Sequence, residues 1–247
     1  MNILITGATG FLGKNLIDRL SQDSDINIMS YSRDTDLAQL DEYLNSCDFV
    51  FHFAAVHRPK DPMEFYKVND NFFEWILNKL EEHGNTCPVV LTSSIQALDK
   101  NDYGRSKLIA ENLLRAHAER SGAKAIIYRL TNTFGRWATP NLHSVAATFC
   151  YNINRDIPIT ISSRDVVMNF YYIDEVIDSF ILQLSGDVKP CDDGIYRLPE
   201  DKVYPITLGE LADTLMYFRE CQKQGTDPEL DTELKEKLWR TYISYAQ

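Results

Sequence analysis

Residues 1–20, MNILITGATGFLGKNLIDRL, carry the most informative pattern of the chain. Its apolar start, Met1 to Thr6, predicts a buried strand, and Phe11 to Leu20 carries apolar side chains at helical spacing. Gly7, Gly10 and Gly13 follow the strand and open the helix in a GxxGxxG pattern. A glycine turn lets the backbone approach a pyrophosphate, and the positive end of the helix holds its charge. The segment therefore predicts a dinucleotide-binding turn.

The chain beyond this segment continues to alternate short apolar runs with stretches of helical period, which predicts an α/β fold with a doubly wound parallel sheet of Rossmann type. Further strands are expected at Ile26–Ser30, Asp48–Ala55, Pro88–Ser94 and Lys124–Leu130, with helices through Val68–Leu80 and Tyr103–Glu119. We expect residues 1–135 to form the dinucleotide-binding domain.

Residues 136–247 show looser alternation and are expected to form a smaller substrate-binding cap, interleaved with the first domain. Helices are expected at Ser144–Arg155 and Asp174–Ser185, with a short strand at Ile157–Ile161 between them. Two apolar stripes, within 208–218 and 230–245, predict packed helices.

The composition restricts the possible partners. The chain of 247 residues has a net charge of −11, so nucleic acid is not expected as a partner, and an anionic ligand needs a local positive site. The five cysteines lack CxxC spacing, which argues against a disulfide framework or a metal site and favours the cytoplasm. No apolar run is long enough for a membrane span or a signal peptide.

The end of the second strand bears on the choice of cofactor. An NAD site usually places an acid there, whereas this chain has Tyr31, Ser32 and Arg33. A guanidinium suits a 2′-phosphate, so we expect NADPH/NADP, with Ser32 and Arg33 as the phosphate contacts. Asp34 keeps open the alternative that Arg33 is only a solvated surface residue.

A reacting site is expected where the Pro88–Ser94 strand meets the following helix. Tyr103 and Lys107 are four residues apart and therefore project from one helical face. A phenol exchanges protons poorly near neutral pH, and a neighbouring ammonium favours its phenolate. Ser94 is expected to hydrogen-bond the substrate oxygen. These residues predict a proton donor, its tuning group and an aligning hydroxyl.

Taken together, these features resemble the extended short-chain dehydrogenase/reductase family. The family's motifs correspond here to GATGFLG at 7–13, HFAA at 52–55, TSS at 92–94, YGRSK at 103–107 and RLTNTFG at 129–135. The resemblance covers nearly the whole chain. It implies that the catalytic hydroxyl is Ser94, with Ser93 as second choice.

The same resemblance implies further contacts. The cofactor would be bound, besides Tyr103, Lys107, Ser32 and Arg33, by Gly7, Thr9, Gly10, Phe11, Leu12, Gly13, Ala54, Ala55 and Leu130. The nucleotide diphosphate of the substrate would be faced by Asn132, Asn141 and Leu142. Met168 stands where many relatives have a phosphate-binding Arg, which leaves Arg136 or Arg164 to replace it.

The reaction expected is the reduction of a keto group. Sugar dehydratases have an Asp-Glu pair just after the catalytic hydroxyl, and this chain has Ile95 and Gln96. Segments 93–97, 141–151 and 206–210 look like the reductase domain of bifunctional capsular polysaccharide enzymes, which act on UDP-linked 4-keto-6-deoxy-N-acetylhexosamines. In those enzymes a cupin domain follows, so the chain is expected to be either truncated or a stand-alone reductase.

Several alternatives stay open. The resemblance implies a homodimer, but the chain could also be a nucleotide-sugar 4-epimerase, a non-catalytic dinucleotide sensor, or a subunit that works with a separate cupin. Asp174 and Glu175 are expected to serve as the N-cap and first-turn acid of a helix rather than as catalytic carboxylates. His52 is expected to be a hydrogen-bonded core residue rather than a ligand. His57 and Arg58 lie on a loop where substrate contact and simple exposure are equally expected.

Overall fold

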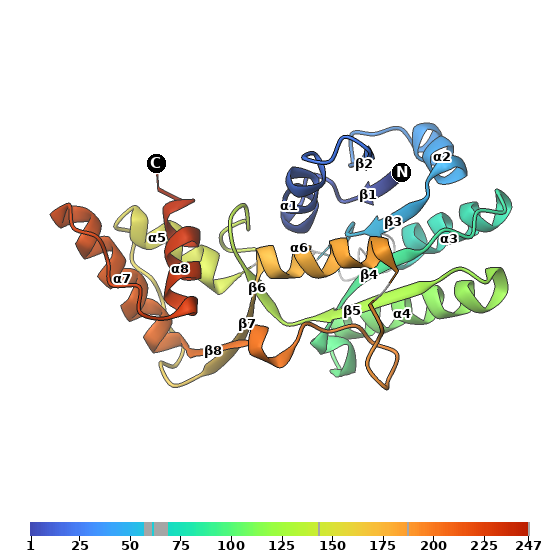
Figure 1. Cartoon of the computed structure of the whole chain (residues 1–247). Helices are drawn as coiled ribbons and strands as arrows, with labels where there is room; N and C mark the ends of the chain where they lie inside the picture. The colour runs from blue at the N-terminus through green and yellow to red at the C-terminus, as the bar shows by residue number, and fades with distance from the viewer. Residues whose placement is uncertain (57–60, 62–68, 143, 187, 247) are drawn as a thin grey trace. The chain divides into compact units, whose positions relative to one another are not determined.

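The computed structural model describes residues 1–56, 61, 69–142, 144–186 and 188–246 (Figure 1). Contacts divide the chain into two compact units. Unit 1 comprises Met1–Leu130 and Phe180–Arg197, and unit 2 comprises Thr131–Ser179 and Leu198–Gln247.

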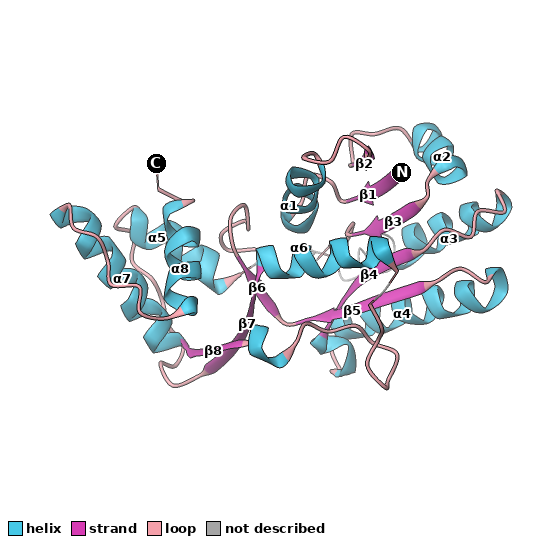
Figure 2. Cartoon of the chain, viewed as in Figure 1, coloured by secondary structure: helices cyan, strands magenta, loops and turns pink. Residues whose placement is uncertain are grey.

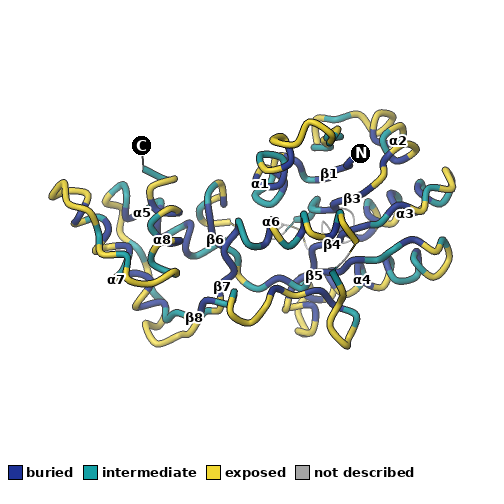
Figure 3. Tube along the Cα trace, in the orientation of Figure 1, coloured by how far each residue is buried: buried dark blue, intermediate teal, exposed yellow. Residues whose placement is uncertain are grey.

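Unit 1 is built on a five-stranded sheet whose strands all run parallel. The strands are β1 (Asn2–Thr6), β2 (Asn27–Tyr31), β3 (Phe49–His52), β4 (Val89–Ser94) and β5 (Ala125–Leu130), in the order β2-β1-β3-β4-β5. Most of these strands are apolar because both faces of a parallel sheet are covered, and all six residues of β4 are buried (Figure 3). The predicted Rossmann-type doubly wound fold is confirmed.

Helices pack on both faces of this sheet (Figure 2). One face is covered by α2 (Leu37–Ser46), α3 (Phe72–Glu82) and α4 (Asp102–Ser121), whose apolar side chains form a core with Leu4, Val50 and Ile127. The other face carries Phe51 and Tyr128, which contact Phe180 at the end of α6. Helix α1 (Phe11–Leu20) buries Leu16 and Leu20. Because sheet side chains alternate between faces, the central strands supply both cores.

The strand order creates the ligand-binding edge of unit 1. The chain runs outward from β1 to β2 and returns on the other side of β1 to β3, so the direction of winding reverses between β1 and β3. In open α/β sheets, ligands bind at the carboxyl ends of the strands at such a point. The glycine turn follows β1, and Ala54 and Ala55 follow β3, at this edge.

Unit 2 contains a three-stranded sheet and helices. Strand β6 (Asn132–Phe134) pairs in parallel with β7 (Val167–Tyr172), which pairs antiparallel with β8 (Tyr204–Thr207). The helices are α5 (Val145–Asn154), most of α6 (Ile173–Leu182), α7 (Leu208–Gln224) and α8 (Glu233–Ile243). A capping box between Thr207 and Glu210 starts α7. No described helix has the length and apolarity needed to cross a bilayer.

One predicted strand is wrong. Residues Ile157–Ile161 have no strand pairing, and Ile157 is exposed. Asp156 adopts a positive φ of 55° and Pro158 lacks a backbone N–H, so this segment leaves α5 through a turn. The sheet of unit 2 uses β6, β7 and β8 instead.

Candidate functional site

The glycine turn after β1 is shaped for close approach of a ligand. Gly7 has a φ of +69°, and a Cβ there would lie 2.7 Å from the backbone nitrogen of Ala54. A Cβ on Gly13 would lie 2.4 Å from the carbonyl oxygen of Gly7. Gly10 precedes α1 and offers no side-chain cap. The start of α1 thus presents backbone rather than side chains, which is the cradle that a pyrophosphate requires.

The end of β2 lies against this turn, because the backbone nitrogen of Ala8 donates to the carbonyl of Tyr31 at 3.2 Å. Ser32 then closes a turn: its N–H donates to Thr35 Oγ1 at 3.1 Å, and its carbonyl accepts from the Thr35 N–H at 3.0 Å. Arg33 and Asp34 are the exposed middle residues. Arg33 is therefore on the ligand-binding edge, with its guanidinium in solvent.

Ser94 and Tyr103 meet at the end of β4. Ser94 is only 8% exposed and its hydroxyl accepts from the backbone nitrogen of Gln96 at 3.1 Å. The Ser94 side chain also hydrogen-bonds Tyr103. Burial raises the pKa of Tyr103 to about 12, and the bond from Ser94 acts in the opposite direction. The phenol is therefore protonated at neutral pH.

Lys107 lies one helical turn beyond Tyr103. Its Nζ atom is 5.7 Å from the centre of the Tyr103 ring and donates to the carbonyl of Thr92 at 3.0 Å. Burial lowers the pKa of Lys107 to about 8, while Glu111 and Asp70 raise it. The lysine is thus held in the site by β4 and remains largely charged at neutral pH.

The start of α4 is fixed tightly against the end of β4. Asn101 caps the helix by accepting from the Gly104 N–H at 2.7 Å. A Cβ on Gly104 would lie 2.0 Å from the Gln96 carbonyl oxygen, so glycine allows α4 to pack on the short 3-10 helix η2 (Ile95–Leu98). This packing brings Tyr103 to Ser94.

Ser93, the second choice for the catalytic hydroxyl, has another partner. Its Oγ donates to Glu111 Oε1 at 2.6 Å. The guanidinium of Arg129 donates to the two oxygens of the same carboxylate at 2.8 and 2.7 Å. Glu111 is 1% exposed. This network ties β4, α4 and β5 together and directs Ser93 away from Tyr103, so Ser94 is the hydroxyl that the geometry favours.

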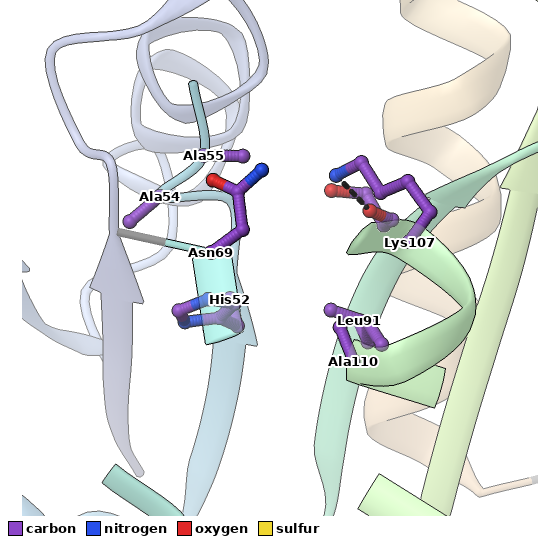
Figure 4. Close-up of a pocket in the computed structure, with 8 residues that line it drawn as sticks. His52, Ala54, Ala55, Asn69, Leu91, Lys107 and Ala110 are labelled. Atoms are coloured by element: carbon purple, nitrogen blue, oxygen red, sulfur yellow. Dashed lines mark hydrogen bonds between the residues drawn. The ribbon is translucent and has the colours of Figure 1, made fainter. Parts of the chain in front are cut away.

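A small pocket lies between β3 and α4 (Figure 4). Lys107 directs its amine into the space opposite Asn69, above His52. Asn69 accepts from the Val56 N–H at 2.8 Å, which fixes its amide. The pocket is lined by His52, Ala54, Ala55, Asn69, Leu91, Thr92, Lys107 and Ala110. Sequence reasoning missed Asn69, since a lone polar residue before a helix carries no distinctive local signal.

His52 is a buried core residue, as expected. Its Nδ1 shares a hydrogen bond of 2.9 Å with Thr6 Oγ1, and its ring stacks on Phe73. Burial, and then the charge of Lys107, lower the pKa of His52 to about 3, so the ring is neutral. It supplies shape and polarity to the pocket without charge.

Leu130 ends β5 in register with Ser94, at the same edge of the sheet. Ala54 and Ala55 line the pocket, and Thr9, Phe11 and Leu12 lie at or just after the glycine turn. The expected cofactor and reacting residues of unit 1 therefore gather along one edge. His57 and Arg58 lie outside the described residues.

The expected substrate residues belong to unit 2. Asn132 is on β6, and Asn141 has a φ of 61° with its N–H bonded to Thr148 Oγ1 at 2.8 Å. Leu142 follows and is exposed. Arg136 stacks on Trp137 at 4.1 Å, and Arg164 pairs with Asp213 on α7 at 2.5 Å. Arg164 already has a carboxylate partner.

The acids Asp174 and Glu175 lie in the first turn of α6, as expected. Glu175 additionally accepts from the Tyr204 hydroxyl at 2.8 Å and pairs with Lys202 and Lys237 at 3.3 Å each. This carboxylate has a structural role between α6, β8 and α8. Among the residues that the structure describes, no group of His, Cys, Asp or Glu could hold a metal ion.

The unit 1 site combines a protonated phenol, an aligning hydroxyl and a buried ammonium beside a glycine turn. Such a set can donate a proton to a carbonyl oxygen and stabilise the phenolate left behind. The glycine turn fits a dinucleotide, because side chains at Gly7 and Gly13 would clash with the backbone of Ala54 and of the turn itself and so distort it.

Comparison with known proteins agrees with this geometry. The model of the NAD dependent epimerase/dehydratase family matches residues 3–192. The chain is 37% identical over 245 residues to a UDP-2-acetamido-2,6-beta-L-arabino-hexul-4-ose reductase from Pseudomonas aeruginosa, covering 99% of this chain and 65% of that protein.

Comparison with solved structures agrees with the match to this family. The capsular polysaccharide assembling protein CapF from Staphylococcus aureus superposes with a TM-score of 0.88 at 38% identity, covering 100% of this chain and 66% of that one. A UDP-glucose 4-epimerase from Thermotoga maritima superposes with a TM-score of 0.79 at 18% identity, over 99% of this chain and 98% of that one, which supports the fold alone. The chain thus spans about two thirds of the length of its more similar relatives.

Proposed function

Because the chain belongs to the NAD dependent epimerase/dehydratase family, we propose that it is an oxidoreductase that reduces the keto group of a nucleotide-linked 4-keto-6-deoxy sugar with NADPH. The product would be a precursor of a capsule or another surface polysaccharide. The names of the Pseudomonas reductase and of the Staphylococcus capsule protein support this substrate class and favour a UDP-linked sugar.

One observation carries the proposal: Ser94, Tyr103 and Lys107 meet at the end of β4. Tyr103, with its pKa raised to about 12, holds a proton that it can donate to the carbonyl oxygen. Ser94 orients that oxygen, and the ammonium of Lys107 stabilises the phenolate that forms. NADPH, when bound, supplies the hydride.

The two units take separate tasks in this proposal. Unit 1 binds the dinucleotide through the glycine turn and the ends of β2, β3 and β5, with Ser32 and Arg33 on the 2′-phosphate. Unit 2 serves as the substrate-binding cap, with Asn132, Asn141 and Leu142 facing the diphosphate. Arg136 and Arg164 are the two candidates for the phosphate contact, and Arg164 would have to exchange its exposed pairing with Asp213 for the phosphate.

The proposal extends to the oligomeric state and the cellular location of the protein. We expect a homodimer in the cytoplasm, where nucleotide sugars and NADPH are available and where the five free cysteines stay reduced. A cupin domain, attached or separate, would act on the same sugar.

The test is an assay of purified protein with NADPH and a panel of UDP- and dTDP-linked 4-keto-6-deoxy sugars, followed by the nicotinamide absorbance. Consumption of NADPH with a UDP-linked 4-keto-N-acetylhexosamine, and formation of the 4-hydroxy sugar, is the expected result. A 4-epimerase would instead interconvert 4-hydroxy sugars without net consumption of NADPH. No oxidation of NADPH with any member of the panel would overturn the proposal.

A further inference from the structure

Asp70 is a buried acid without an evident structural purpose. It immediately precedes the residues that begin α3 and is only 6% exposed. Within the part of the chain that the structure describes, both of its carboxylate oxygens are buried and have no hydrogen-bond partner. Burying an unpaired carboxylate is costly, so such groups in folded proteins generally have a compensating charge or a role at a site.

The position of Asp70 is at the edge of the candidate site. Its neighbour Asn69 lines the pocket on the side opposite Lys107 (Figure 4). The carboxylate of Asp70 interacts electrostatically with the ammonium of Lys107. The interaction lowers the pKa of Asp70 and raises the pKa of Lys107. Lys107 itself is only 5% exposed.

The other groups around Lys107 do not provide a free negative charge. On α4, Glu111 already binds Arg129 through two bonds and accepts from Ser93. On β3, His52 is neutral, because its pKa is lowered to about 3. On β4, Thr92 offers only its carbonyl oxygen, and Tyr103 on α4 is a protonated phenol. Among the described residues, Asp70 is therefore the carboxylate near Lys107 that has no cation of its own.

We propose that Asp70 is a positioning residue that acts through Lys107: its unpaired buried carboxylate keeps the lysine charged in the place where the Thr92 carbonyl holds it. The inference rests on the proposed function, in which the charged lysine supports Tyr103. Burial raises the pKa of Asp70 to about 6 while Lys107 lowers it, so at neutral pH the carboxylate is ionised. Its charge raises the pKa of Lys107 against the opposite effect of burial. Removal of Asp70 should therefore discharge the lysine at a lower pH.

The first experiment needs no substrate. In ¹³C NMR of the full chain with labelled aspartate carboxyls, one carboxyl should titrate near pH 6 and be absent from Asp70→Asn. In Lys107→Met its pKa should rise further, because the positive charge that lowers it is lost. An unchanged pKa in Lys107→Met would overturn the proposal, whether or not the chain is a reductase.

The second experiment measures the pH profile of kcat/KM for NADPH oxidation with a UDP-linked 4-keto-6-deoxy-N-acetylhexosamine. In Asp70→Asn the alkaline limb should move by about one pH unit to lower pH, as expected for losing a nearby opposite charge. Glu74→Gln is the matched control, since it removes an exposed acid from α3 and should keep the original profile. A profile of Asp70→Asn that matches Glu74→Gln would refute the inference.

Thermal unfolding separates this role from a structural one. The fold raises the pKa of Asp70, so its ionised form is less favourable in the folded than in the unfolded chain. Asp70→Asn should therefore not lower the unfolding midpoint at neutral pH, and a clear loss of stability would favour a structural role. If the original protein oxidises no NADPH with the panel, the proposed function fails, and the NMR titration still decides the pairing of Asp70 with Lys107.

Discussion

Lys107 holds its Nζ 5.7 Å from the centre of the Tyr103 ring while donating to the Thr92 carbonyl at 3.0 Å. The contact with Tyr103 follows from the spacing of four residues on α4, and the contact with Thr92 follows from the packing of α4 against β4. The ammonium is therefore fixed between a strand end and a phenol. This arrangement makes the chemistry of the site testable by single substitutions.

Tyr103→Phe removes the proton donor without changing the ring. We expect kcat for sugar reduction to fall about a hundredfold to ten-thousandfold, the range for loss of a general acid, while the Kd for NADPH measured by fluorescence stays similar. Full turnover in this variant would instead favour a dinucleotide sensor.

Ser94→Ala and Ser93→Ala should separate chemistry from stability. Loss of the Ser94 hydroxyl removes an aligning donor and should lower kcat about a hundredfold or more, with little change in urea denaturation. Loss of Ser93 should cost about 1–2 kcal/mol of unfolding free energy, because the buried Glu111 carboxylate loses a hydrogen bond. The reverse pattern would exchange the two assignments.

Arg33→Ala tests the choice between cofactors. If the guanidinium binds a 2′-phosphate, KM for NADPH should rise about tenfold or more, as for loss of a charge-assisted hydrogen bond, and KM for NADH should not change. Equal use of both cofactors by the original protein, unaltered in Arg33→Ala, would contradict NADPH specificity.

Gly13→Ala tests the glycine cradle. The new Cβ would lie 2.4 Å from the Gly7 carbonyl oxygen and 2.8 Å from the Cα of Ala8, so backbone must shift. We expect a loss of about 1–3 kcal/mol in unfolding free energy, together with weaker dinucleotide binding. Gly10→Ala is the control for stability, because its Cβ would meet the same oxygen at 3.1 Å. Equal stability of both variants would contradict the tight packing at Gly13.

The rate of reduction should depend on pH through Lys107. Its pKa is lowered to about 8 by burial, so its charge is present below that pH and is lost as the pH rises through it. Tyr103, with a pKa of about 12, remains protonated over this range. We therefore expect kcat/KM to decline above about pH 8, approaching a tenfold loss per pH unit. A flat profile beyond pH 9, with the fold intact by circular dichroism, would exclude control by Lys107.

Local patterns in the sequence predicted much of unit 1. The span of α1 at Phe11–Leu20 was predicted, and β4 and β5 were placed within one residue, because strand and helix periodicities are properties of neighbouring residues. Helix α2 was missed, although Leu40 and Leu44 are one turn apart and Asp36 caps the helix. In unit 2 the strands were missed because β6 and β8 are short and pair with segments distant in the chain.

The glycine turn after β1 and the spacing of Tyr103 and Lys107 could be read from the sequence alone, since both depend on backbone geometry within a few residues. The tertiary structure was needed to show which serine is available to Tyr103, because Ser93 donates to Glu111, a carboxylate that Arg129 also binds. It was also needed to place Asn69 across the pocket from Lys107. Their nearness depends on how α3 and α4 pack on the sheet, and no pattern along the chain encodes the distance between separate elements.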